Sequence, residues 1–262
     1  MKIALMDSGL GLLAAAAAMR RLRPDVGLVL SSDPGSMPWG PRTPDDIVAR
    51  ALTVARAAAA HRPDALIVAC NTASVHALPA LRAALEPGLP VIGTVPAIKP
   101  AAAGGGPVAI WATPATTGSP YQRDLIRTHA ASVDVTEVPC PGLADALEHA
   151  DEAGIARAIA AAALLTPREV RTVVLGCTHY ELVAERIRAA LSHPGLPEVT
   201  LHGSADAVAA QALRRLGGAA VPAADAEPGD LTVLLAGNRA TLTDPALTYA
   251  EGRLLAAVTH AH

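Results

Sequence analysis

The chain has 262 residues, of which 51% are hydrophobic and 17% charged, a size that suits one large domain or two small ones. A formal net charge of -3, with 2 Trp, 3 Tyr and no Phe, gives no reason to expect a nucleic acid or a membrane as a partner. The 3 cysteines lack the close spacing of a disulfide framework or a zinc site, so we expect a cytoplasmic protein with reduced thiols and no metal.

Strand and helix patterns alternate along the chain. Short apolar runs predict strands at 3–6, 27–31, 65–69, 90–94, 108–111, 133–138, 172–175, 199–201 and 231–235. Stretches rich in Ala, Leu and Arg predict helices at 45–61, 74–85 and 144–165, and Thr43 and Pro44 form a typical start for the first of them. This alternation predicts the α/β class, with βαβ units and parallel sheets.

Two parts of the sequence are similar to each other. The Gly-rich segment 101–107 indicates a domain boundary, and after it the strand at 108–111 ends in small polar residues as the strand at 3–6 does. In each half a later apolar run, within 63–72 or 171–179, leads into a cysteine. The pattern favours a duplicated architecture. The alternative is that all βαβ chains resemble one another at this level.

Cys70 and Cys177 are the leading candidates for catalytic residues. Each follows a predicted parallel strand, at the carboxyl end where open α/β sheets bind ligands. Free cysteine often packs as a small core residue, but two matched contexts favour a function, and neighbouring helix N–H groups are expected to depress the thiol pKa. Two thiols on opposite sides of a substrate can invert a carbon centre by proton transfer. Cys140 has no matching context and is interpreted as structural.

Polar and titratable residues accompany both cysteines. Asn71, Thr72 and Thr178 offer amide and hydroxyl donors to a bound anion, although they also suit helix capping. Asp7 ends the first strand and His179 follows Cys177 closely, so each is a candidate proton carrier; the alternatives are a turn cap and a structural histidine.

No cofactor is expected. The chain contains two lysines, Lys2 and Lys99, and neither lies at the carboxyl end of a predicted strand, where a Schiff base to pyridoxal phosphate would be needed. The segment 7–11 has two glycines but lacks the third glycine of a dinucleotide fingerprint. The sequence therefore favours cofactor-independent chemistry on a small molecule.

Several motifs together resemble those of the cofactor-independent aspartate/glutamate racemases. In chain order they are Asp7-Ser8-Gly9, Pro38-Trp39-Gly40, Ala69-Cys70-Asn71-Thr72 and Gly176-Cys177-Thr178-His179. They span most of the chain, and the two cysteine motifs are the most specific. His179 favours the glutamate branch of this family over the aspartate branch, which typically has Glu there.

The resemblance implies two pseudosymmetric α/β domains with parallel sheets, residues 1–96 plus 206–262 and residues 97–205, with the active site in the cleft between them. It implies racemisation of L- and D-glutamate, which supplies D-glutamate for peptidoglycan synthesis, and it is compatible with a homodimer. The implied catalytic residues are Cys70, Cys177, Asp7 and His179. The implied substrate-binding residues are Asp7, Ser8, Pro38, Trp39, Gly40, Cys70, Asn71, Thr72, Thr113, Thr116, Cys177, Thr178 and His179.

Three departures from the family pattern bear on the substrate. Leu12 stands where the family usually repeats glycine, Trp39 replaces a tyrosine, and 202–204 reads His-Gly-Ser instead of Ile-Asp-Ser. Aspartate or another amino-acid-like substrate therefore remains an alternative, as does a non-catalytic descendant that binds an amino acid or a protein.

Overall fold

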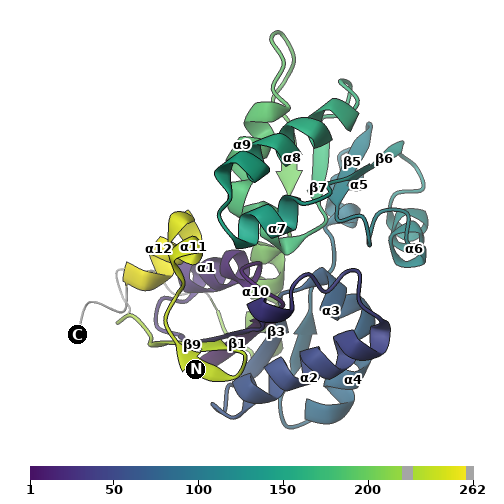
Figure 1. Cartoon of the computed structure of the whole chain (residues 1–262). Coiled ribbons are helices and arrows are strands. Elements are labelled where there is room, and N and C mark those ends of the chain that lie inside the picture. The colour runs from purple at the N-terminus through teal and green to yellow at the C-terminus, as the bar shows by residue number, and fades with distance from the viewer. Residues whose placement is uncertain (220–226, 258–262) are drawn as a thin grey trace. The chain divides into compact units, whose positions relative to one another are not determined.

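The computed structural model describes residues 1–219 and 227–257. The chain divides into two compact units, Met1–Val95 with Ala205–His262 (unit 1) and Pro96–Ser204 (unit 2). Each unit contains its own sheet with helices packed against it, so the predicted α/β class with parallel strands is confirmed (Figure 1). None of the helices in the described ranges is both long enough and apolar enough to cross a membrane.

Unit 1 contains a six-stranded sheet in the order β10-β9-β2-β1-β3-β4. Its strands are β1 (Lys2–Asp7), β2 (Gly27–Ser32), β3 (Ala65–Val68), β4 (Val91–Gly93), β9 (Leu231–Leu235) and β10 (Asn238–Ala240). All neighbours are parallel except β10, which runs antiparallel to β9. β1 and β3 are apolar and buried along almost their whole length, as expected for central parallel strands covered on both faces.

Two groups of helices cover this sheet (Figure 1). One group is α2 (Pro44–Ala59), α3 (Asn71–His76) and α4 (Leu78–Leu85); the other is α1 (Leu12–Leu22), α10 (Ala205–Arg215), α11 (Asp244–Thr248) and α12 (Ala250–Ala257). The helix start predicted at Thr43 is confirmed, because its hydroxyl accepts a hydrogen bond from the N–H of Asp46 at 3.3 Å.

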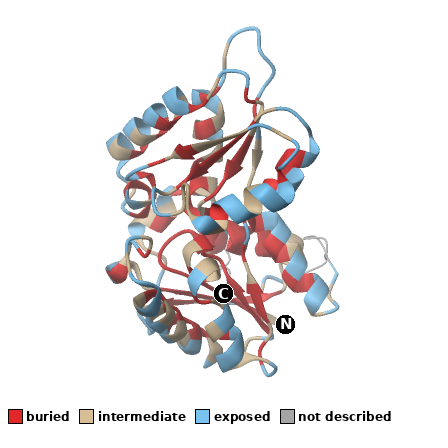
Figure 2. Cartoon of the chain, turned by 90° about the vertical axis from the view of Figure 1, so that its right-hand side faces the viewer, coloured by how far each residue is buried: buried red, intermediate tan, exposed pale blue. Residues whose placement is uncertain are grey.

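Unit 2 contains a four-stranded, entirely parallel sheet in the order β6-β5-β7-β8. The strands are β5 (Val108–Ala112), β6 (Val135–Pro139), β7 (Thr172–Leu175) and β8 (Thr200–His202). The helices are α5 (Ile98–Ala103), α6 (Pro120–His129), α7 (Leu143–Glu148), α8 (Glu152–Leu165), the 3-10 helix η2 (Thr178–Val183) and α9 (Ala184–Ala190). In both units the buried residues gather along the strands and on the helix faces that touch them (Figure 2).

The two sheets share one topology. In each, the first strand of the unit is central, the second lies on one side of it and the third on the other, giving β2-β1-β3-β4 and β6-β5-β7-β8. The strand order therefore reverses between the first and third strands, and open α/β sheets bind ligands at the carboxyl ends of the strands at such a reversal. β1 and β3 lead into Asp7 and Cys70 in unit 1, and β5 and β7 lead into Thr113 and Cys177 in unit 2.

Two local predictions were wrong in detail, and one strand was not predicted. The helix expected at 74–85 is two helices, α3 and α4, which meet at Ala77 just before Pro79. The helix expected at 144–165 is also two helices, because Asp151 caps the second one by accepting a hydrogen bond from the N–H of Gly154 at 3.0 Å. Strand β10 was not predicted at all; it forms a hairpin with β9 through two residues of positive φ, Ala236 and Gly237.

Candidate active site

In unit 1, two adjacent strand ends place Asp7 beside Cys70. Asp7 is the last residue of β1, and Cys70 lies two residues after β3, immediately before α3. The N–H of Ala69 donates to the carbonyl of Met6 at 2.8 Å, which extends the pairing of the two strands up to the cysteine. Asp7 is fully buried and Cys70 is 5% exposed. The fold thus brings a carboxylate and a thiol together in a nearly dry environment.

Burial dominates the electrostatics of Cys70. It raises the pKa of the thiol well above its ordinary value, and the negative charge of Asp7 and the hydrogen bond between the thiol and Asp7 raise the pKa further. Hydrogen bonds from the N–H groups of Ala73 and Ser8 favour the thiolate but are the smaller effects. The N–H groups thus act in the expected direction, but burial and Asp7 outweigh them, so the predicted net decrease of the pKa is wrong and Cys70 carries its proton at neutral pH.

The polar residues next to Asp7 and Cys70 make local hydrogen bonds or belong to the first turn of a helix. The N–H of Ser8 donates to Asp7 Oδ1 at 2.7 Å, and the Ser8 hydroxyl lies 3.3 Å from the same oxygen. Asn71 and Thr72 form the first turn of α3, directly after Cys70. Behind the cysteine, the Thr94 hydroxyl donates to the carbonyl of Val68 at 2.8 Å. Nothing in the sequence pattern pointed to Thr94 as a support for this strand end.

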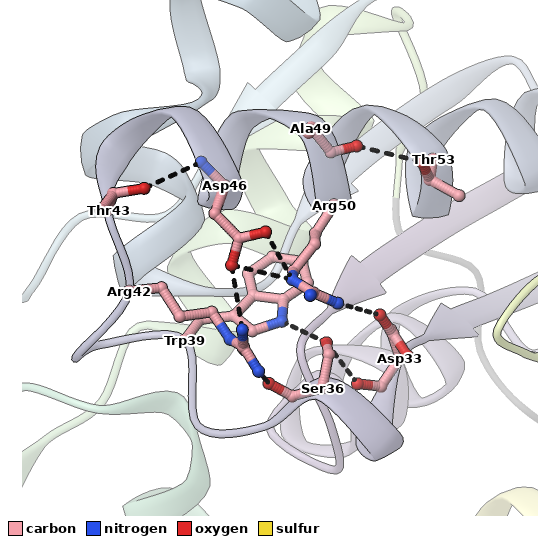
Figure 3. A network of polar contacts seen from close by, with 9 residues as sticks. All are labelled: Asp33, Ser36, Trp39, Arg42, Thr43, Asp46, Ala49, Arg50 and Thr53. Carbon is pink, nitrogen blue, oxygen red and sulfur yellow. Dashed lines mark hydrogen bonds and ion pairs between the residues drawn. The ribbon is translucent and has the colours of Figure 1, made fainter.

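The segment Asp33–Gly40, between β2 and α2, contains the predicted substrate residues Pro38, Trp39 and Gly40. The Trp39 side chain is only 2% exposed and packs in the core of unit 1, in the cluster that includes Cys70. Its indole Nε1 donates to the Ser36 hydroxyl at 2.8 Å (Figure 3). Pro38 is exposed and Gly40 is half-buried. The indole of Trp39 is therefore part of the core, whereas Pro38 and Gly40 remain accessible to solvent.

In unit 2 a thiol, an imidazole and a carboxylate lie next to one another in space. His179 Nδ1 lies 3.9 Å from Cys177 Sγ, and His179 Nε2 lies 3.0 Å from Glu148 Oε2. His179 and Glu148 are both buried, whereas Cys177 is half-buried. With Nε2–H donating a hydrogen bond to the carboxylate, Nδ1 is the nitrogen that faces the thiol as an acceptor, so the arrangement suits an imidazole that assists a cysteine. Glu148 is not among the predicted site residues; its one signal in the sequence is a buried acid at the end of the short helix α7.

The other predicted residues of unit 2 surround this group. Thr113 follows β5, and its hydroxyl lies 3.2 Å from that of Thr116. Thr178 is buried at the start of η2. The turn that holds the two threonines is fixed by Glu137 of β6, which accepts a hydrogen bond from the N–H of Gly118 at 2.7 Å. Cys177 directly precedes the 3-10 helix η2, and the α-helix α9 begins only at residue 184.

Cys140 has the environment of a core residue. It is 2% exposed, and burial raises the pKa of its thiol to about 12. The hydroxyl of Tyr180 donates to the carbonyl of Cys140 at 3.3 Å. A thiol that remains protonated throughout the neutral range is a poor base, in agreement with the structural interpretation of Cys140.

Gly203 and Ser204 contact Glu181 of η2. The N–H and the hydroxyl of Ser204 donate to Glu181 Oε1 at 2.8 Å and 2.9 Å. A Cβ on residue 203 would meet the carboxylate of Glu181, so a larger residue there would require this flexible side chain to move. Leu12, a departure from the family pattern, is the buried first residue of α1.

The structure groups the predicted residues by unit. Asp7, Ser8, Pro38, Trp39, Gly40, Cys70, Asn71 and Thr72 belong to unit 1, and Thr113, Thr116, Cys177, Thr178 and His179 belong to unit 2. Within the described residues, no group of three or more His, Cys, Asp or Glu side chains is arranged to hold a metal ion. Each unit contributes one cysteine at the reversal point of its sheet, with a titratable neighbour beside it. Two α/β units, each with a thiol beside a titratable group, are what the resemblance to racemases implies.

Comparison with known proteins agrees with this class. A model of the Asp/Glu/Hydantoin racemase family matches residues 11–212. A glutamate racemase of Roseiflexus sp. is 38% identical over 71% of this chain and 70% of its own, and one of Pseudomonas entomophila is 36% identical over 82% and 81%. The crystal structure of Escherichia coli glutamate racemase with L-glutamate and the activator UDP-MurNAc-ala aligns with a TM-score of 0.76 at 28% identity, covering 98% of this chain and 93% of that one. The chain belongs to the Asp/Glu/Hydantoin racemase family.

Proposed function

We propose that this protein interconverts L- and D-glutamate by proton transfer between two cysteines, without a cofactor. The observation that carries the proposal is the matched pair of thiol sites, Cys70 with Asp7 and Cys177 with His179 and Glu148. The assignment of glutamate as substrate is supported by the similarity to glutamate racemases from several bacteria.

In the proposed reaction, the two thiols act on opposite faces of one α-carbon. The Cys177 thiolate removes the α-proton of L-glutamate, and the Cys70 thiol gives its own proton to the other face, so that one C–H bond breaks and another forms. D-Glutamate reacts in the reverse sense, with Cys70 as the base. The raised pKa of Cys70 suits its role as donor in the first direction, because the residue holds its proton until the carbanion forms.

The neighbouring residues have distinct tasks in this proposal. Asp7 accepts the proton of Cys70 when that cysteine must become the base, and His179 does the same for Cys177, held in the required tautomer by Glu148. The carbanion has no cofactor to delocalise its charge, so fixed donors around the substrate carboxylate must lower its energy. Asn71, Thr72, Thr113, Thr116 and Thr178, with backbone groups of 38–40, are the proposed donors.

The test is racemisation in deuterium oxide, followed by circular dichroism and mass spectrometry, with a chelator present and no cofactor added. We expect the dichroism of L- or D-glutamate to decay to zero and the product enantiomer to carry deuterium at the α-carbon. Replacement of either Cys70 or Cys177 by alanine should abolish both signals. Full activity in either variant would refute the two-thiol step, and no deuterium incorporation by the unmodified protein would indicate a binding protein instead.

The same assay with aspartate distinguishes the substrates. Faster turnover of aspartate than of glutamate would overturn the glutamate assignment while leaving the racemase class intact. We further propose that the D-glutamate formed supplies peptidoglycan synthesis. The corresponding test is growth of a bacterium that requires D-glutamate, which expression of the unmodified chain should restore and expression of the Cys177→Ala variant should not.

A further inference from the structure

Ser36 is the residue at which the polar contacts of the segment Asp33–Gly40 converge (Figure 3). Its hydroxyl accepts a hydrogen bond from Trp39 Nε1 at 2.8 Å and donates one to the carbonyl of Asp33 at 3.1 Å. Its carbonyl accepts two from the guanidinium of Arg42, from Nε at 2.9 Å and from Nη2 at 2.6 Å. One small, buried side chain and its own peptide group thus connect both ends of the segment.

Ion pairs fasten this segment to α2. Arg42 Nη1 lies 2.9 Å from Asp46 Oδ2, and Arg50 Nε lies 3.0 Å from Asp46 Oδ1. Arg50 also reaches back to Asp33 Oδ2 at 3.5 Å. Hydrogen bonds from Arg50 and Arg42 lower the pKa of Asp46, so this carboxylate stays charged at neutral pH. The segment is therefore tied to a rigid helix at its beginning and just beyond its end.

Trp39 links the contacts of Ser36 to the position of the backbone at 38–40. Its indole lies in the apolar core of unit 1, in the cluster that contains Cys70 and Ala73. The indole N–H can only donate a hydrogen bond, and the Ser36 hydroxyl is its acceptor. Loss of this acceptor would leave the N–H buried without that partner, which favours rotation of the ring and displacement of the backbone that carries it.

We propose that Ser36 is a positioning residue for the amino-acid substrate. It holds Trp39 in place and thereby sets the position of the backbone from Pro38 to Gly40, which contacts the substrate in the function proposed above; the inference rests on that function. Ser36 has no part in proton transfer in this scheme, since its hydrogen bonds are to Asp33, Trp39 and Arg42. Its effect should therefore appear in substrate binding and not in the chemical step.

The test is steady-state kinetics of Ser36→Ala, of Trp39→Phe, which keeps an aromatic ring but removes the N–H, and of the double variant. Loss of one hydrogen bond should raise KM for L- and D-glutamate about three- to tenfold, with kcat changed less than about twofold. Both substitutions remove the same interaction, so the double variant should be little worse than the poorer single one. A residue that merely stabilised the fold would produce neither the KM-specific effect nor this coupling.

Two further variants keep the test decisive. Arg42→Gln removes the guanidinium that donates two hydrogen bonds to the Ser36 carbonyl, and it should also raise KM. This variant replaces Ser36→Ala if Ser36→Ala fails to fold. Thr53→Ala removes an exposed hydroxyl of the same helix α2, which donates to the carbonyl of Ala49 at 3.0 Å, and should leave KM unchanged.

The outcomes separate this inference from the function on which it rests. Unchanged KM in Ser36→Ala or, if that variant does not fold, in Arg42→Gln and Trp39→Phe, overturns the inference while the unmodified protein remains a glutamate racemase. Fully additive effects of Ser36→Ala and Trp39→Phe also overturn it. An unmodified protein that does not racemise glutamate refutes the proposed function and this inference together.

Discussion

The contact between His179 and Glu148 supports a quantitative prediction for the variant Glu148→Gln. The wild-type carboxylate oxygen lies 3.0 Å from Nε2, and the side chains of the two residues are only 4% and 6% exposed. Glutamine keeps the shape and an acceptor oxygen but loses the charge. A hydrogen bond to a charged partner contributes about 1 to 2 kcal/mol more than a neutral one. We therefore expect kcat/KM to fall about five- to thirtyfold.

The reason for the loss is specific to one of the two proton transfers. A weaker acceptor at Nε2 makes the imidazole less basic, so that Cys177 is a poorer base for the L-enantiomer. Because the two enantiomers have equal free energies, kcat/KM must fall equally in both directions. Activity alone therefore cannot show which transfer has slowed, and isotope effects on α-deuterated substrates are needed.

The isotope assay compares α-deuterated L-glutamate with α-deuterated D-glutamate. In the proposed scheme Cys177 removes the deuteron from the L-form and Cys70 removes it from the D-form. In Glu148→Gln the transfer at Cys177 limits the rate more strongly, so the isotope effect should rise for the L-form and fall for the D-form. Glu152→Gln, an exposed acid that pairs with Arg186 at 2.9 Å, is the matched control and should change neither value. An unchanged kcat/KM in Glu148→Gln, or the opposite isotope pattern, would refute the assigned role.

Three other predictions follow from the fold and its charges. Asp7→Asn removes a negative charge that raises the pKa of Cys70, so the pKa of that thiol, measured by the pH dependence of its alkylation, should decrease; an increase would contradict the assigned cause. Cys140→Ala should remain an active racemase and lose about 1 kcal/mol of stability. The pKa of Cys140 is raised in the folded state from 9.0 to about 12. The protonated thiol therefore contributes its full share of the free energy of unfolding below pH 9, and this share is lost as the pH rises to 12. In urea unfolding, the stability of the alanine variant should fall less over that pH range than that of the unmodified protein. Ala236→Asn should stabilise the hairpin turn by about 0.5 to 1 kcal/mol, because asparagine tolerates positive φ, whereas Ala153→Asn on the exposed face of α8 should destabilise.

The elements that the sequence predicted well are those with an uninterrupted local pattern. The central strands are continuous apolar runs, and the start of α2 combines a capping hydroxyl with a proline and two acids. The positions of both cysteines after parallel strands follow from the same patterns, because a buried strand that ends in small and polar residues is visible in a single sequence.

The breaks in the helices were harder to predict because they depend on single residues within regular patterns. In 144–165 the Ala- and Leu-rich periodicity continues across the break, and Ala150 adopts a positive φ of 51° that its side chain does not favour. Asp151 then begins a new helix through its own side chain. In 74–85, Pro79 lies in the first turn of the second helix, a position where proline is common. The proline alone did not show that a new helix begins there.

In the candidate site, the residues close to a cysteine in the sequence were predicted, whereas the contacts between distant parts of the chain were not. His179 is two residues from Cys177 and was found by proximity, but Glu148 is separated from His179 by 31 positions and meets it only through the packing of α7 against η2. The pKa of Cys70 was predicted in the wrong direction, since adjacency to a helix start is a local feature and complete desolvation is not. Ser36 escaped notice because its role depends on the buried indole of Trp39.

The discontinuity of unit 1 has a consequence for the order in which the chain can fold during synthesis. Unit 2 is one continuous stretch, Pro96–Ser204, so all four of its strands are available once that stretch has left the ribosome. Strand β2 of unit 1, by contrast, waits for β9, whose residues pair with it from Leu28–Leu231 onward. Until then β2 presents an open edge with unpaired backbone groups, a template on which nascent chains can aggregate. A pause in synthesis after Ser204 has emerged from the ribosome, but before Leu231 has, would therefore leave one unit complete and the other exposed at the middle of its future sheet.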